Sequence, residues 1–179
     1  MSGIALLAPD WPAPPGVHAL FTLRGQGAGE GASRGAHGAF NLGDHVGDLP
    51  QAVDTNRARL AHALRGARPV FMKQVHGTVV LALTAPGAHP SASAQDVATA
   101  DAAVSAAPGL ACTVMVADCL PVLLTNRTGT AIAAAHAGWR GLASGVLQST
   151  LASFRAAARM ESAQQAINIE ASEVLAWLG

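Results

Sequence analysis

Four short apolar runs in the second half of the chain constrain the fold more than any other feature. None of them alternates apolar with polar residues, as a strand with one face in water would. Continuous apolar character over so few residues is typical of strands that are buried on both faces. Pro108-Gly109 and Thr128-Gly129 lie between successive runs and predict turns. The runs cover residues 102–105, 110–117, 121–125 and 130–135.

Helical segments are predicted on both sides of these strands. Residues 50–65 are expected to form a helix that Asp48 caps, and residues 139–158 a second one. A short helix is expected over residues 172–177. Buried strands with flanking helices indicate an α/β or α+β fold, which we assign to a single domain over residues 1–179. Shorter strands are expected over residues 20–24, 69–73 and 78–84.

Composition and charge exclude several classes of protein. Eleven Lys and Arg residues balance eleven Asp and Glu residues, so there is no electrostatic reason to expect nucleic acid or an anionic membrane as partner. The chain has no apolar run of about eighteen residues and no basic region followed by an apolar segment at its start, which predicts a cytoplasmic protein. Cys112 and Cys119 lie too close together in one extended segment for an unstrained disulfide.

Three polar residues stand at the ends of predicted strands. His76 separates two strands, Cys119 interrupts an apolar run, and His136 follows the last of the four runs. Strand ends commonly present active-site groups from a rigid scaffold. Two imidazoles and a thiolate suit zinc or another metal of similar softness, and three protein ligands leave a fourth position open, as in catalytic zinc sites.

The residue types alone leave a second interpretation open. Free cysteine is among the most buried residue types, and we assign Cys112 to the core on that basis. Cys119 could equally be a nucleophile with His136 as its base. Because the three residues of the metal hypothesis lie far apart in the sequence, their spacing does not decide between a metal ligand set and a cysteine nucleophile.

The segment AHAGWRG at residues 135–141 adds a candidate anion site. It joins a predicted strand to a predicted helix through Gly138, which leaves free backbone N–H groups near His136. Arg140 adds a forked cationic donor that suits phosphate or carboxylate. A metal beside an anion site is an arrangement that phosphate-dependent chemistry could use.

Four motifs together resemble the bacterial polyphenol oxidase, or laccase-domain, family (YfiH-like). They are NLG-D-HVGD at residues 41–48, KQVHG at 73–77, VADCLPV at 116–122 and AHAGWRG at 135–141, in the order that the family has them. The resemblance covers nearly the whole chain. Members of this family are regarded as zinc-dependent purine nucleoside enzymes, so the resemblance implies a purine nucleoside phosphorylase.

The resemblance implies a fold, a cofactor and a set of residue roles. The fold is a layered α-β-β-α arrangement with mixed sheets, related to the catalytic domain of cytotoxic necrotising factors. The zinc ligands are His76, Cys119 and His136, and copper is a less favoured metal. The implied reactions are phosphorolysis of adenosine, inosine, guanosine and methylthioadenosine with inorganic phosphate, and adenosine deamination. The substrate and phosphate site is lined by Arg24, Ser33, Asn41, His45, Gln74, Asp118 and Arg140.

Three alternatives follow from the same residues. One is a cysteine amidase or deamidase that uses Cys119 and His136. A second starts from the expectation that the chain lacks the C-terminal portion of its family, which would leave an inactive domain that only binds nucleoside. A copper polyphenol oxidase is the least favoured, because a copper cluster needs many histidines and the chain has seven. A homodimer stays open as the oligomeric state.

Overall fold

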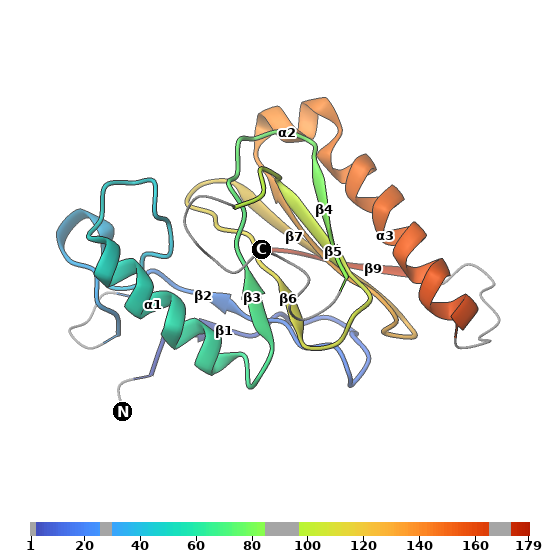
Figure 1. Ribbon diagram of the computed structural model, residues 1–179, viewed down its shortest axis with the longest axis horizontal. Coiled ribbons are helices and arrows are strands. Elements are labelled where there is room, and N and C mark those ends of the chain that lie inside the picture. Colours follow the sequence, from blue (N-terminus) through green and yellow to red (C-terminus); the bar gives the residue numbers. More distant parts are fainter. Residues whose placement is uncertain (1–2, 26–29, 85–96, 165–172) are drawn as a thin grey trace. The chain divides into compact units, whose positions relative to one another are not determined.

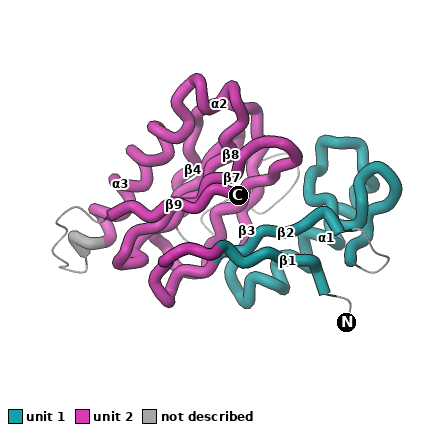
Figure 2. The backbone as a smooth tube through the Cα atoms, turned by 180° about the vertical axis from the view of Figure 1, so that it is seen from behind, with its two compact units in different colours: residues 1–9, 19–67 teal, residues 10–18, 68–179 magenta. Residues whose placement is uncertain are grey.

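The computed structural model describes residues 3–25, 30–84, 97–164 and 173–179. The chain divides into two compact units, which Figure 2 shows in different colours. The first unit comprises residues 1–9 and 19–67, and the second comprises residues 10–18 and 68–179. The assignment of residues 1–179 to a single domain stays a prediction.

The first unit contains a short antiparallel pair of strands and one long helix. Strand β1 (Leu6–Leu7) pairs antiparallel with β2 (Phe21–Thr22), which lies within the strand predicted at residues 20–24. A 3-10 turn, η1 (Gly35–His37), follows, and then helix α1 (Pro50–Ala63). The helix predicted over residues 50–65 is therefore confirmed to within two residues.

Helix α1 begins at a proline and buries a narrow stripe. Pro50 suits the first helical position because its missing N–H would have no partner there in any case. Val53 and Leu60 are buried together with Asn56. The predicted cap by Asp48 is wrong: the N-cap residue is Leu49, without a side-chain cap. The Asp48 carboxylate instead accepts hydrogen bonds from other partners.

The second unit is built on a mixed five-stranded sheet, seen in Figure 1 with the long helix beside it. The strand order is β4-β5-β8-β7-β9, with β4 parallel to β5 and the other neighbours antiparallel. A separate parallel pair joins β3 to β6. The elements are β3 (Arg68–Val70), β4 (Val80–Leu83), β5 (Ala102–Ser105), β6 (Leu110–Cys112), β7 (Leu120–Asn126), β8 (Ile132–Ala137), α2 (Trp139–Ser144), α3 (Val146–Gln164) and β9 (Val174–Leu178).

Both faces of the central strands are covered, as the unbroken apolar runs predict. Ala102 and Val104 of β5 belong to the cluster that Phe154 of α3 completes. Ala103, between them in sequence, belongs to a second cluster with Leu110. Because successive side chains of a strand point to opposite faces, these two memberships place one hydrophobic core on each side of the sheet. The described residues thus form a mixed α/β fold with three sheets; the implied α-β-β-α layering stays a prediction.

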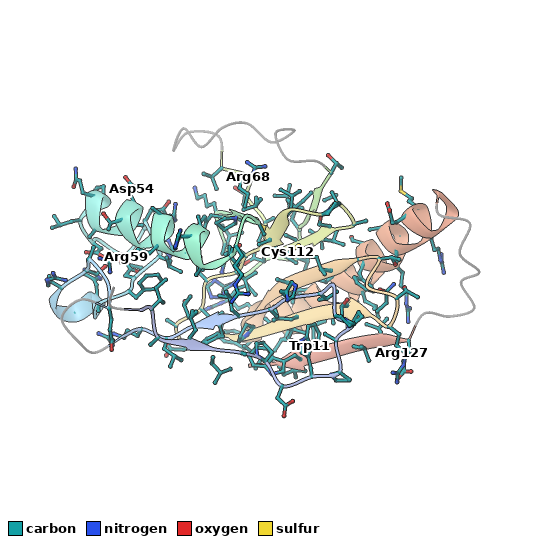
Figure 3. All side chains as sticks on the ribbon, turned by 90° about the horizontal axis from the view of Figure 1, so that it is seen from below. Trp11, Asp54, Arg59, Arg68, Cys112 and Arg127 are labelled. Atoms are coloured by element: carbon teal, nitrogen blue, oxygen red, sulfur yellow. The ribbon has the colours of Figure 1, made fainter. Side chains whose placement is uncertain are left out.

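Of the two remaining helix predictions, one is confirmed with a break and the other is wrong. The helix expected over residues 139–158 is broken at Gly145, whose φ of 95° lies in the left-handed region, so that α2 ends and α3 begins there. The short helix expected over residues 172–177 is wrong: residue 172 lies outside the described residues, and Val174–Leu178 form strand β9, which pairs with β7. Arg127 just after β7, labelled in Figure 3, forms an ion pair with Glu173 just before β9 (Nε–Oε2, 2.6 Å).

The predicted run 110–117 is a strand only as far as Cys112, and the segment after it contains Met115, which is hydrogen-bonded to the Gln74 side chain. None of the helices in the described residues combines the length and the hydrophobicity that a membrane-spanning helix needs.

We expect Gly145→Ala to lower the free energy of unfolding by roughly 1–2 kcal/mol, since an L side chain at positive φ is strained. The nearest atom to an added Cβ is 3.5 Å away on the flexible Gln148 side chain, so the effect isolates the backbone conformation. Denaturant unfolding measures it. Gly16→Ala, which enters open space in the same unit, serves as the control, and equal stability of the two variants would contradict this account.

Candidate metal centre

Three segments of the second unit bring the predicted ligands together. His76 lies in the turn between β3 and β4, Cys119 immediately precedes β7, and His136 lies within β8. Strands β7 and β8 are antiparallel neighbours, with Pro121 paired to His136 and Leu120 paired to Ala137. This register brings the residue before β7 next to the residues that end β8.

The side chains converge closely enough to share one ion. One possible ligand atom from each of His76, Cys119 and His136 lies within 4.8 Å of the others. The Cys119 Sγ is 3.6 Å from His76 Nε2. The two imidazole rings meet edge to face, with centroids 4.6 Å apart and planes at 69°. His136 is buried, whereas His76 and Cys119 are half-buried.

The donor set fits zinc, and so does the distance between Cys119 and His76. A tetrahedral zinc ion with Zn–S near 2.3 Å and Zn–N near 2.05 Å separates its sulfur and nitrogen ligands by about 3.6 Å. The distance between Cys119 Sγ and His76 Nε2 already has that value. Two borderline nitrogen donors and one thiolate also match the ligand preferences of this metal.

Gly138 forms the wall beside the cluster. A Cβ atom built on it would lie 2.7 Å from His76 Cδ2 and 2.8 Å from Cys119 Sγ. Its φ of −68° is ordinary for any residue, so close approach of the backbone, not conformation, requires glycine here.

Asp101 forms hydrogen bonds with two of the three predicted ligands, His76 and His136. Its carboxylate is fully buried at the start of β5 and lies 3.0 Å from His136 Nδ1. It also accepts hydrogen bonds from the backbone N–H groups of Val75, His76 and Gly77. Burial alone would raise the pKa of the Asp101 carboxyl, but the hydrogen bonds from His136 and these N–H groups outweigh burial and hold the pKa below its ordinary value.

The backbone at His76 is unusual for a residue with a side chain. Its φ of 61° lies in the left-handed region, which costs a non-glycine residue roughly 1–2 kcal/mol. Such conformations persist only where the surrounding structure holds them, and they are frequent at functional sites. The three hydrogen bonds to Asp101 hold the turn at His76.

The other residues of this unit that the sequence singles out have distinct environments. The Gln74 side chain donates to the carbonyl of Met115 and accepts from its N–H, so both ends of its amide hold the segment that leads to Cys119. Asp118 is exposed. Arg140 is exposed as well, and its guanidinium stacks on the Trp139 ring at 4.4 Å. Their contacts with substrate stay predictions.

Cys112, which the sequence assigns to the core, is partly buried and packs against the second hydrophobic cluster. Burial raises the pKa of its thiol to about 12, and its Sγ lies 3.9 Å from the carbonyl oxygen of Ile132. A thiol so resistant to ionisation is unsuited to nucleophilic or metal-binding roles.

The remaining predicted substrate residues belong to the first unit. Ser33 and Asn41 both donate to Asp48 Oδ2, at 2.6 and 3.0 Å, and Asn56 donates to Ser33 Oγ. Arg24 donates to the carbonyl of Ala36 and His45 is exposed beside Asp44. Ser33 and Asn41 are thus gathered around one carboxylate. The structure describes these residues within their own unit, and their roles toward substrate stay predictions.

Sequence reasoning missed Asp101 and the reason for Gly138. A signal for Asp101 was present, because an aspartate directly before a fully apolar run must find buried hydrogen-bond donors. Gly138 gave no such signal, since its requirement arises from contact with residues far away in the sequence.

The fold agrees with the comparisons to known proteins. Residues 18–179 match the family model described as "Multi-copper polyphenol oxidoreductase laccase", and the chain belongs to this family. A purine nucleoside phosphorylase of Pseudomonas aeruginosa is 46% identical over 175 residues, which cover 98% of this chain and 61% of that protein. Purine nucleoside phosphorylase YfiH of Escherichia coli is also 46% identical over 175 residues, covering 97% of this chain and 62% of the relative.

Solved structures confirm the likeness of the fold. A Neisseria meningitidis protein with 42% sequence identity superimposes with a TM-score of 0.76, over 97% of this chain and 62% of the other. A Bacillus licheniformis protein, YfiH, has 26% identity and a TM-score of 0.68, over 90% and 57%. The chain therefore spans about three fifths of the length of these relatives.

We expect Gly138→Ala to lower zinc affinity about tenfold or more, because the added methyl overlaps the ligands and overpacking costs about 1–3 kcal/mol. Titration of metal-free protein against a chromogenic chelator measures the affinity. Gly16→Ala is the control. Zinc affinity of Gly138→Ala equal to that of the unchanged chain would show that the site does not lie against Gly138.

Acidification is expected to weaken the first unit through Asp48. Hydrogen bonds from Ser33 and Asn41 hold the pKa of Asp48 below its ordinary value. A lowered folded-state pKa means that the stabilisation is complete above the unfolded pKa, about 3.9, and is lost as the pH falls through the folded value. In metal-free protein, the difference in unfolding free energy between the unchanged chain and Asp48→Asn should shrink below about pH 4. A difference that grows on acidification would contradict the assignment.

Proposed function

We propose that this chain forms a zinc-dependent purine nucleoside enzyme that carries out phosphorolysis of adenosine, inosine, guanosine and methylthioadenosine and deaminates adenosine. The observation that carries the proposal is the convergence of His76, Cys119 and His136 within one ion's reach. The relatives named purine nucleoside phosphorylase, at 46% identity, support the substrate class.

The three side chains would hold the ion in defined protonation states. Cys119 binds a metal as the thiolate and both histidines bind as neutral imidazoles, so binding releases protons. His76 presents Nε2 to the cluster, where it faces Cys119 Sγ. His136 uses Nδ1 for Asp101, which leaves its Nε2 for the ion. A bound zinc ion supplies Lewis acidity and lowers the pKa of a coordinated water.

Phosphorolysis requires a second anchor for the co-substrate. In this reaction a phosphate oxygen forms a bond to the ribose carbon while the glycosidic bond breaks, and the base leaves with the bonding electrons. Arg140 lies two residues beyond Gly138 and presents an exposed guanidinium, which suits a phosphate dianion. Trp139, on whose ring this guanidinium stacks, is an exposed residue too, at 69%, and its indole would supply an apolar contact for a purine.

The further roles implied by the family resemblance belong to the same proposal. Arg24, Ser33, Asn41, His45, Gln74 and Asp118 would bind substrate or phosphate. Zinc is favoured over copper because among the described residues the group of potential ligands holds two histidines and one cysteine, whereas a copper cluster for phenol oxidation needs many histidines. A cytoplasmic location and a homodimer stay predictions.

A cysteine amidase or deamidase is the second candidate function. The Cys119 Sγ lies 3.6 Å from an imidazole nitrogen, a separation that a thiol and its base also show. That imidazole is His76, while the sequence hypothesis names His136. Bound zinc should protect Cys119 from alkylation if the metal assignment holds; rapid alkylation with loss of amidase activity would favour the cysteine nucleophile.

We expect His76→Ala to lose phosphorolysis and deamination together, by a factor of at least 10², since one of three metal ligands is removed. The purified chain is incubated with adenosine and phosphate, and adenine, inosine and hypoxanthine are followed by chromatography alongside metal analysis. His62→Ala, an exposed histidine of α1, is the matched control.

Each other outcome of this experiment has a definite meaning. Full turnover by a zinc-free His76→Ala protein would overturn the proposed function. Protection of the unchanged chain against heating by adenosine, without any product, would instead support the domain that only binds nucleoside. Stoichiometric copper with oxygen-dependent phenol oxidation would support the polyphenol oxidase.

A further inference from the structure

One buried carboxylate contacts both segments that supply the histidines. Asp101 has 0% exposure, and its two oxygens together accept from His136 Nδ1 and from the N–H groups of Val75, His76 and Gly77. Its position is fixed from its own backbone as well. The Asp101 N–H donates to the carbonyl of Val79, and its carbonyl accepts from the His136 N–H at 2.7 Å.

The contact with His136 selects a tautomer. A carboxylate has only acceptor sites, so the Nδ1 atom 3.0 Å from Asp101 Oδ1 must carry the proton. The lone pair of the neutral ring then lies on Nε2, the atom left for the cluster with Cys119. Metal-bound histidines commonly show such a carboxylate on their other nitrogen, which fixes the tautomer and the ring orientation.

The contacts with the turn at His76 fix a backbone conformation. Oδ1 accepts from the His76 N–H at 2.8 Å and Oδ2 accepts from the Gly77 N–H at 2.7 Å. The Val75 N–H lies between them, 3.1 and 3.2 Å from the two oxygens. Successive N–H groups around one anion form a nest, and here the nest includes the left-handed φ of His76. The carboxylate therefore favours the one turn geometry that directs the His76 ring at Cys119.

We infer that Asp101 is a positioning residue that orients both imidazoles in the metal-free protein. It fixes the tautomer of His136 through Oδ1, and it fixes the backbone turn at His76 through both carboxylate oxygens. The inference rests on the proposed metal centre. Asp101 touches neither the ion nor a substrate, and it acts only through the two histidines. One side chain thus fixes the orientation of both His76 and His136, which lie sixty residues apart in the sequence.

The isosteric change Asp101→Asn separates these functions. If the amide keeps its oxygen in place of Oδ1, its NH₂ group faces the Gly77 N–H, and two donors oppose each other. If the amide turns over, the NH₂ group faces the His76 N–H and His136 Nδ1. Neither orientation satisfies both histidine segments. We expect zinc affinity, measured by chelator competition, to fall roughly 10- to 100-fold.

A matched control removes a buried hydrogen bond of the same sheet without touching a histidine. Thr125 is fully buried in β7 and donates to the carbonyl of Ala131. Thr125→Val keeps the shape of the side chain and should lose stability but keep the zinc affinity of the unchanged chain. If Thr125→Val loses affinity as Asp101→Asn does, the effect is general destabilisation and the inference is overturned.

A measurement without metal tests the inference independently of the proposed function. Long-range ¹⁵N NMR of the chelator-treated, unchanged chain should show His136 with its proton on Nδ1, and slow exchange of the His76 and Gly77 amides. A proton on Nε2 would overturn the inference even if Asp101→Asn does not fold.

The two proposals fail in different ways. If the unchanged chain binds no metal while the His136 tautomer is as expected, the proposed function fails and the positioning role of Asp101 stands. If the chain binds zinc and Asp101→Asn binds it equally well, the positioning role fails and the proposed function stands.

Discussion

The site depends on the register of β8 against its two neighbours. Pro121 of β7 pairs with His136, and Ala102 of β5 pairs with Ala135. Ala135 and Ala137 pack into the core with α3, so His136 between them points to the opposite face. Since side chains alternate along a strand, a slip of one residue would turn His136 toward α3 and leave a polar ring in an apolar core. Burial of alanines on one face thus specifies the position of the imidazole on the other.

Small residues make this arrangement possible. The runs rich in alanine let α3 lie close to the sheet, with Phe154 and Val146 filling the space that larger strand residues would occupy. At the end of β8, Gly138 lets the backbone pass within contact distance of Cys119 and His76. The polar groups of the candidate metal centre lie at or near strand ends, where Asp101 accepts hydrogen bonds from donors that would otherwise be buried without partners.

Much of the fold follows from local sequence pattern, and the failures have physical causes. The apolar runs predicted β5, β7 and β8 closely, because strands that are buried on both faces consist of continuous apolar residues. The apolar periodicity of residues 139–158 continues through Gly145, yet helix α2 ends there. The cause is the left-handed backbone conformation of Gly145, which the spacing of apolar side chains does not reveal. Residues 174–178 became a strand because the edge of β7 was available for pairing, a tertiary fact that local propensity does not contain.

The candidate site was predictable in its residue types but not in its assembly. Two histidines and a cysteine at predicted strand ends left a metal site and a cysteine nucleophile equally open, and the structure brings these three residues together. The hydrogen bonds from Gln74 to Met115 and from Ser33 to Asp48 could not be predicted from the sequence, because the two residues of each pair are distant in the sequence. The same holds for the left-handed turn at His76, which exists through contacts with Asp101.

X-ray absorption at the zinc edge of the purified chain tests the central claim most directly, because it reports the atoms that surround the ion. The account predicts one sulfur ligand near 2.3 Å and two imidazole nitrogens at about 2.0–2.1 Å, with the remaining position taken by a light atom. A coordination shell without sulfur, or one without imidazole, would show that His76, Cys119 and His136 do not hold the metal together.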